Sequence, residues 1–202
     1  METEAGVGEH GDGMKRTPAT YADLEALPSS VVGELIAGVL YASPRPASPH
    51  AVAASCLGGE LMGPFHRGRG GPGGWVILDE PELHYEDDVL VPDMAGWRRE
   101  RMPRVPHVVG FTLAPDWVCE VLSPSTRTLD RTVKLPVYAR EGVRHVWLLD
   151  PVARLLEVFR LEGMHYSLRE THSGAGPVHV EPFEALALDL AYLWNEVSDA
   201  RE

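Results

Sequence analysis

The stretch "DWVCEVL", residues 116–122, constrains the fold of this chain most strongly, because a carboxylate lies in the middle of its most apolar strand-like segment. Such a run predicts a buried strand near the centre of a sheet. Side chains alternate between the two faces of a strand, so Glu120 shares a face with Val118 and Leu122. The sequence must therefore supply a partner for Glu120, since an unpaired buried charge is costly.

The N-terminal half predicts helices alternating with strands. We expect a short helix in "TPATYADLEALP" and one strand in "GELIAGVLYAS", with Glu34, Ile36 and Leu40 on the same face. A helix follows, with Ser48 as its N-cap and Pro49 at its first position. "GPFHRGRGGPGG" predicts a flexible loop, and three strands are expected in "WVIL", "ELHY" and "VLVPDMAGW".

The C-terminal half predicts one helix and an antiparallel meander. The helix spans about 129–141 and ends before Gly142. Pro136 breaks its hydrogen bonding, which favours a second helical piece preceded by a turn from Asp130 to Lys134. The meander comprises "VRHVWLLD", "LLEVFRL" and "HYSLRE", and "FEALALDLAYLW" closes the chain as a helix or docked strand.

Together these elements predict an α/β or α+β fold, a mixed β-sheet flanked by helices. We expect a disordered tail over residues 1–17 and a single domain over 18–202. The loop before "DWVCEVL" is expected to run from residue 98 to residue 115.

Composition restricts the function. The formal net charge of −12 argues against broad, non-specific binding to nucleic acid. Arginine supplies sixteen of the eighteen lysine and arginine residues, so Lys134 is one of only two lysines. No apolar run is long enough for a membrane span. Cys56 and Cys119 lack metal-ligand spacing and predict free thiols in a reducing cytoplasm, rather than a disulfide.

Asp93 and Glu120 form the first candidate site. If their strands are neighbours, the two β-carbons lie about 4.5–5.5 Å apart, and either a proton or a cation must relieve the repulsion. Oxygen ligands favour Mg²⁺ or Mn²⁺. Pro92 marks an edge or bulge that re-aims Asp93, and Lys134 can bring a positive charge to the same place. The alternative is an ordinary ion pair of each acid with a nearby arginine.

Three segments resemble the Uma-two type restriction endonuclease family, whose members are compact PD-(D/E)XK nucleases: "GELIAGVLYASPRPASPH", "VPDMAGW" and "CEVLSPSTRTLDRTVKLPVYAREGVRHVWLLDP". The resemblance runs from about Tyr21 to Trp194. It implies a restriction-endonuclease-like sheet with an antiparallel extension, a Mg²⁺-dependent endonuclease acting on DNA, and a homodimer.

Carried over to this sequence, the resemblance assigns the metal ligands to Asp93 and Glu120. The lysine expected two places after Glu120 is replaced by Leu122, and Lys134 matches the position from which the family supplies that charge. Glu34 and His50 match an acidic and a histidine position. Glu34 either joins the metal shell or forms a salt bridge, and His50 contacts phosphate or water, or caps a helix.

Further residues remain candidates from the chain itself. Glu82 is a possible extra metal ligand, while Arg98, Arg127 and Arg131 either contact phosphate or balance nearby acids. Asp130 lies four residues before Lys134 and can hold it in a helical ion pair. Two other functions remain open: a non-catalytic interaction module on the same fold, and a hydrolase for small phosphate esters.

Overall fold

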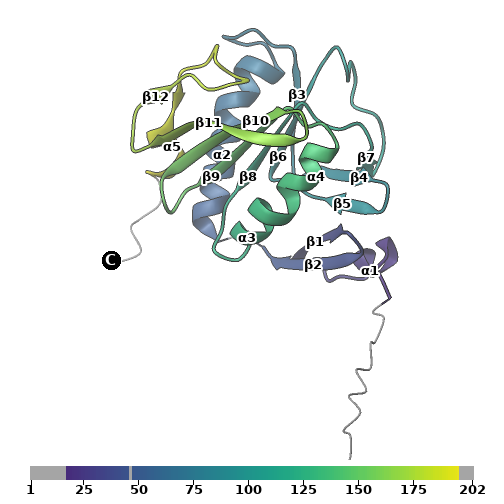
Figure 1. Cartoon of the computed structure of the whole chain (residues 1–202). Helices are drawn as coiled ribbons and strands as arrows, with labels where there is room; N and C mark the ends of the chain where they lie inside the picture. The colour runs from purple at the N-terminus through teal and green to yellow at the C-terminus, as the bar shows by residue number, and fades with distance from the viewer. Residues whose placement is uncertain (1–16, 46, 196–202) are drawn as a thin grey trace, which may run out of the picture.

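A six-stranded mixed sheet forms the centre of the computed structural model, which describes residues 17–45 and 47–195 (Figure 1). Its strands, in spatial order, are β11 (His165–Ser173), β10 (Leu155–Glu162), β9 (His145–Asp150), β8 (Trp117–Val121), β6 (Met94–Arg98) and β3 (Trp75–Asp79). Strands β8 and β9 are parallel, and the other neighbours are antiparallel. The predicted central strand, β8, therefore lies inside the sheet with every residue buried.

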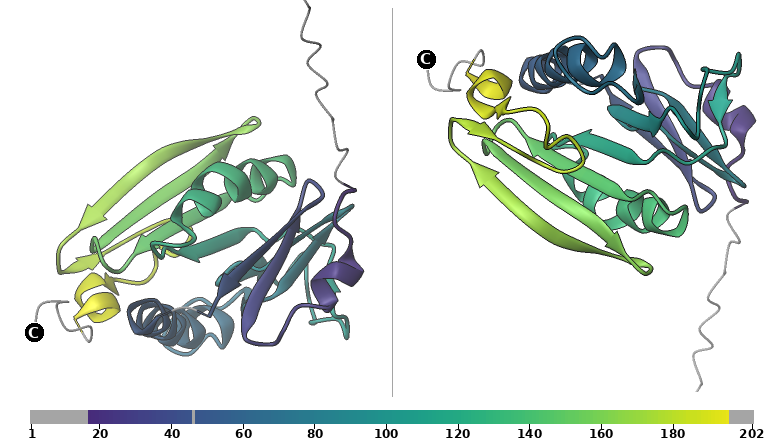
Figure 2. Two further views of the ribbon diagram at one scale, coloured as in Figure 1. Left: turned by 90° about the horizontal axis from the view of Figure 1, so that it is seen from below. Right: turned by 90° about the horizontal axis from the view of Figure 1, so that it is seen from above.

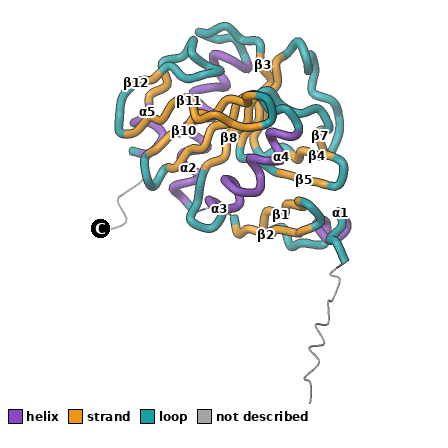
Figure 3. The backbone as a smooth tube through the Cα atoms, viewed as in Figure 1, coloured by secondary structure: helices purple, strands orange, loops and turns teal. Residues whose placement is uncertain are grey.

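A second sheet packs beside the first and contributes one wall of the candidate site. Its order is β2 (Val39–Pro44), β1 (Val31–Ile36), β5 (Asp88–Leu90), β4 (Glu82–Tyr85) and β7 (Gly110–Phe111). The short helix α1 (Tyr21–Glu25) packs against β1, and a small pair, β12 (Pro177–Val178) and β13 (Leu188–Asp189), lies near the C-terminal end (Figure 3). The expected mixed sheet flanked by helices is confirmed, with its strands divided between separate sheets.

Helices cover both faces of the central sheet (Figure 2). On one face lie α2 (Ser48–Leu61), its π-helical continuation η1 (Met62–His66) and α5 (Leu190–Trp194). On the other lie α3 (Arg127–Leu129), the π-helical turn η2 (Asp130–Lys134) and α4 (Leu135–Arg140). Cys119 of β8 belongs to the core on the α2 side, whereas Val118 and Leu122 belong to the core beneath α4. Glu120 therefore points toward the η2–α4 side, as strand alternation predicts.

The segment "GELIAGVLYAS" is a hairpin, and the prediction of one continuous strand was wrong. Ala37 and Gly38 form its two-residue turn with φ of 51° and 72°. Such left-handed turns match the twist of the two strands. Because Leu40 pairs with Leu35, it lies on the face opposite Glu34, which corrects its expected position.

The segment "VLVPDMAGW" also divides in two. Strand β5 ends at Leu90 and belongs to the second sheet, while β6 begins at Met94 in the central sheet. Pro92 lies in the break, where its missing N–H costs no ladder bond. Asp93 is therefore at the crossing between the sheets rather than inside a strand, and the expected continuous face from Val91 to Ala95 does not exist.

Smaller differences concern element ends. The N-cap of α2 is Ala47 instead of Ser48, and η1 extends this helix into the segment predicted as a loop. Strand β7 lies inside the long connection before β8. The sequence "FEALALDLAYLW" contributes both β13 and α5. The expected tail lies, except for its last residue, outside the described residues.

The helical segment over residues 127–140 changes from a π-helical turn to an α-helix just before Pro136. The turn η2 spans Asp130–Lys134 and α4 starts at Leu135, so Pro136 falls in the first turn of the new piece. Gly142 follows the helix with φ of 77°, as expected for its C′ position. Both features were predicted from the sequence.

Both cysteines are free: Cys119 is buried and Cys56 is partly buried. No helix in the described ranges combines the length and the hydropathy needed to cross a membrane.

Candidate functional site

Lys134 is the centre of a buried ionic cluster. Its Nζ lies 2.9 Å from Glu34 Oε1, 3.1 Å from Asp130 Oδ1 and 3.3 Å from Glu120 Oε2. All four residues are buried, with Lys134 only 4% and Glu120 only 2% exposed. Three separate elements, β1, β8 and η2, thus deliver carboxylates to one ammonium group.

The π-helical turn places both Asp130 and Lys134 in this cluster. One extra residue per turn widens the helix, and such turns are frequent at functional sites. The next turn then brings Tyr138 beneath the sheet, where its hydroxyl donates to Glu120 Oε1 at 2.5 Å. Glu120 therefore uses one oxygen for Tyr138 and the other for Lys134.

The pairing of β6 with β8 places Asp93 next to Glu120. Met94 pairs with Cys119, so one step beyond the ladder Asp93 is directly beside Glu120. The backbone N–H of Val121 donates to Asp93 Oδ2 at 2.7 Å, and His50 Nε2 lies 2.9 Å from Oδ1. Both carboxylate oxygens of Asp93 are thus held in place, one by the neighbouring strand and one by the first turn of α2.

A small cavity of about 50 Å³ joins these groups. Its lining includes Glu34, His50, Asp93, Glu120, Asp130 and Lys134. This volume holds about three or four water-sized groups. A larger groove of about 540 Å³ runs along α2 and shares His50, Glu80 and Asp93 with the cavity, so the site continues toward the surface.

The electrostatics of the cluster reflect an excess of negative charge. Burial raises the pKa of Glu120 well above its usual range despite Lys134, and the charges of Asp130, Asp93 and Glu34 act in the same direction. Burial likewise raises the pKa of Glu34 and of Asp130. Burial alone would lower the pKa of Lys134, but its three carboxylates raise it well above the ordinary value. Lys134 is therefore a permanent cation at neutral pH.

The donor set has the chemistry that a hard divalent cation requires. Glu34, Asp93 and Glu120 offer oxygen ligands, and burial raises the pKa of Glu34 and of Glu120, so their ionised forms are costly without a further cation. In the part of the chain that the structure describes, no three or more Asp, Glu, His or Cys side chains are arranged to hold a metal ion. The acids converge on Lys134 instead, so a metal between Asp93 and Glu120 requires the Glu120–Lys134 contact to open.

Four of the sequence candidates lie outside this cavity or are already paired. Glu82 bonds to Tyr21 and His84, away from the cavity, so the geometry gives no support to an additional ligand there. Arg98 is at the far end of β6 from Asp93. Arg127 pairs with Asp150 at 2.6 Å, and Arg131 pairs with Glu157.

Sequence reasoning missed Tyr138 and treated Asp130 only as an ion-pair partner. The available signal was spacing, since Asp130, Lys134 and Tyr138 recur every four residues and so share one helix face. The Glu34 ion pair with Lys134 agrees with the salt-bridge alternative weighed for that residue. Its position in the cavity also leaves it available as a ligand.

The sheets and helices form an α+β architecture that is also found in a protein of known structure. A solved structure from Anabaena variabilis, described as "a putative nuclease belonging to DUF820", superimposes with a TM-score of 0.66 at 23% sequence identity. The match covers 88% of this chain and 98% of that one, and it establishes the shared fold.

The family is established by sequence. The model of the Uma2 family, described as "Putative restriction endonuclease", matches residues 18–191, and the chain belongs to this family. No curated protein matches the sequence.

Proposed function

We propose that this chain is a divalent-metal-dependent endonuclease that hydrolyses phosphodiester bonds in DNA. The observation that carries the proposal is the meeting of Asp93, Glu120 and Lys134 in one cavity, although they come from the β5–β6 crossing, β8 and η2. Membership of the restriction endonuclease family and the nuclease-like fold support the same reaction class.

Asp93 and Glu120 would hold Mg²⁺ or Mn²⁺, and Glu34 would complete the shell. Bound there, the ion would supply a Lewis acid for the scissile phosphate and lower the pKa of a water molecule. His50 and the Val121 amide fix the two oxygens of Asp93, and Tyr138 fixes Glu120. Pre-oriented ligands reduce the reorganisation needed when the substrate arrives.

Lys134 would stabilise the charge that develops on the phosphate in the transition state. Its ammonium is fixed by Glu34 and Asp130 even when Glu120 turns toward a metal. A positive charge that is already in position is worth more in a buried site than in water. The phosphate would enter along the groove beside α2, which reaches the cavity at His50 and Asp93.

Plasmid nicking tests the proposal. In Mn²⁺, the wild-type protein should relax supercoiled plasmid, and Glu120→Gln should lower the rate at least 100-fold, the usual scale for the loss of an essential electrostatic group. Glu82→Gln is the matched control, because Glu82 lies outside the cavity, and it should stay within about twofold of the wild type. Thermal melting of each variant checks the fold. Equal rates for Glu120→Gln and the wild type would overturn the assignment.

A non-catalytic interaction module is the second candidate, favoured by the pairing of Lys134 with three carboxylates. In that case the cluster is a structural ion network, and no metal ion binds in the cavity. Titration calorimetry with Mn²⁺ on the wild type and Asp93→Ala separates the two, since only the nuclease predicts heat that the substitution removes. A third candidate, a small phosphate-ester hydrolase, predicts faster turnover of a small phosphodiester than of plasmid.

We also propose that the enzyme is a homodimer, as the family resemblance implies, and that it works in the cytoplasm. The free thiols of Cys56 and Cys119 agree with a reducing compartment. Light scattering coupled to gel filtration should give twice the 22.2 kDa chain mass. A monomer at every concentration would exclude the dimer and leave the chemistry at each site unaffected.

A further inference from the structure

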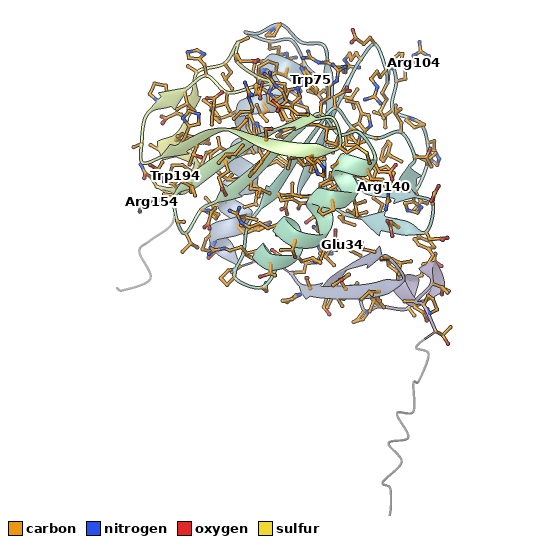
Figure 4. All side chains as sticks on the ribbon, viewed as in Figure 1. Glu34, Trp75, Arg104, Arg140, Arg154 and Trp194 are labelled. Carbon is orange, nitrogen blue, oxygen red and sulfur yellow. The ribbon has the colours of Figure 1, made fainter. Side chains whose placement is uncertain are left out.

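A second polar pocket lies at the opposite end of the central sheet. It has a volume of about 410 Å³ and is lined by Trp75, Arg98, Glu100, Arg101, Asp116, Gly142, Arg144 and His145, which we call the arginine pocket. In Figure 4, Trp75 is labelled near the top of the molecule, and Glu34, on β1 beside the acid–lysine cavity, is labelled well below it. Asp116, just before β8, is four positions from Glu120, about 13 Å along the strand direction. The pocket is therefore distinct from the acid–lysine cavity.

Among the residues that the structure describes, two of the three guanidinium groups in this pocket have no acidic partner. Arg101 is neutralised by Asp116 at 2.9 Å, and the second oxygen of Asp116 accepts the backbone N–H of Arg98 at 2.8 Å. Neither the Arg98 nor the Arg144 guanidinium is within ion-pairing distance of a carboxylate among the described residues. Both arginines line this one pocket, in a chain whose net charge is −12.

The pocket is also partly preformed. The guanidinium carbon of Arg98 lies 4.0 Å above the centroid of the buried Trp75 ring, which limits its freedom. Gly142 lies at the rim with no atom within 4 Å of where a side chain would start, so access there is open. A recess of this volume, with fixed polar groups, has the dimensions of a small-molecule site.

We propose that the arginine pocket binds the phosphate group of a small molecule of mononucleotide size. Planar guanidinium groups bind phosphate oxygens in pairs, and Arg98 and Arg144 are the two that remain available. Three arginines face two carboxylates, Asp116 and Glu100, so the pocket carries a net charge of about +1 with His145 neutral. That balance suits one phosphate monoester better than a polyphosphate.

His145 supplies an independent reporter of binding. Its ring Nδ1 is buried without a hydrogen-bond partner, and burial, helped by Arg160, Arg98 and Arg144, lowers its pKa to about 4. Glu184 acts in the opposite direction. A bound phosphate would offset the positive charge of Arg160, Arg98 and Arg144 and raise the pKa of His145. The proton resonances of the imidazole ring would report this change.

The experiment is a titration of the full chain, in EDTA so that metal chemistry is excluded, with adenosine monophosphate, inorganic phosphate and adenosine. The monophosphate should bind and shift the His145 ring resonances, whereas adenosine should do neither. Arg144→Ser should weaken binding at least tenfold, because Arg144 contributes one of the two free guanidinium groups and no described contact that holds the fold. Arg104→Ser is the matched control, since Arg104 is exposed outside the pocket, and it should change the affinity less than twofold.

Inorganic phosphate binding as tightly as the monophosphate would support the pocket and identify free phosphate as its ligand. Three results would overturn the proposal: no binding of either phosphate probe at millimolar concentration, equal binding of adenosine, or equal losses in Arg144→Ser and Arg104→Ser. None of them depends on nuclease activity, so the two proposals fail separately.

Discussion

At the scale of single residues, Lys134 is the feature on which the site depends. A lysine in a chain that otherwise uses arginine provides a compact ammonium that three carboxylates can share, which a planar guanidinium cannot do in the same space. The cost is that removal of the cation leaves several buried acids without a counter-charge.

Lys134→Met should therefore destabilise the fold severely. Breaking a buried ion pair by removing one partner costs about 3–5 kcal/mol, and here three partners are affected. Urea denaturation at pH 7 should show this loss in the free energy of unfolding, whereas Arg104→Met on the surface should change it by less than about 0.5 kcal/mol. Wild-type stability in Lys134→Met would show that the acids are neutral without the lysine.

Glu120→Gln should have the opposite effect on the metal-free protein. Folding raises the pKa of Glu120. At a pH above the usual carboxylate pKa, the folded protein therefore binds more protons at this residue than the unfolded chain does. Stability should consequently be lost as the pH rises from about 4.5 toward the raised value. The amide carries no charge to bury, so the melting temperature of Glu120→Gln at pH 7 should exceed that of the wild type by about 2–4 °C.

Thermal melts between pH 4.5 and pH 8 would check this prediction. The difference between the two proteins should shrink toward the acidic end, where the wild-type carboxyl is protonated. A wild type more stable than Glu120→Gln at every pH would mean that the Lys134 pairing outweighs the burial of the charge.

At the scale of elements, backbone turns place the site residues. Gly142→Ala should cost about 1 kcal/mol, because φ of 77° strains any residue with a β-carbon, although no atom obstructs it. Gly59→Ala in α2 is the matched control: it also meets no atom within 4 Å, but its helical backbone favours alanine, so stability should rise by up to about 1 kcal/mol. Chemical denaturation of both variants should give changes of opposite sign.

The sequence predicted the elements well where one local rule dominated. The apolar run located β8, and the alternation of side chains along a strand gave the sheet face on which Glu120 lies. Pro136 indicated where the second helical piece begins, and Gly142 indicated where it ends.

Sequence reasoning failed at two breaks between strands. The Ala37–Gly38 turn folds β1 and β2 into a hairpin of one sheet, and the apolar pattern runs across it without interruption. Pro92 marked an irregularity, but a local pattern does not show that β5 and β6 join different sheets. The resemblance offered Glu34 either to the metal shell or to a salt bridge and did not name Lys134 as its partner, and no local pattern pairs β1 with η2.

At the scale of the whole molecule, charge is segregated along the central sheet. The buried acids lie where β8 ends, and the arginine pocket lies where it begins. With a net charge of −12, the chain has little general attraction for a nucleic-acid backbone, and a divalent ion at the acidic end would be needed to bring phosphate close. The proposed nuclease activity would therefore depend on metal occupancy more than on surface charge.

The proposed function requires a divalent ion to bind between Asp93 and Glu120. Diffraction from crystals soaked in Mn²⁺, with the metal located by its anomalous signal, tests this requirement most directly. We expect a peak about 2.1 Å from carboxylate oxygens of both Asp93 and Glu120, with Lys134 withdrawn from Glu120 but still bonded to Glu34 and Asp130. A structure at saturating Mn²⁺ with no peak there, and all three carboxylates still on Lys134, would contradict the proposal.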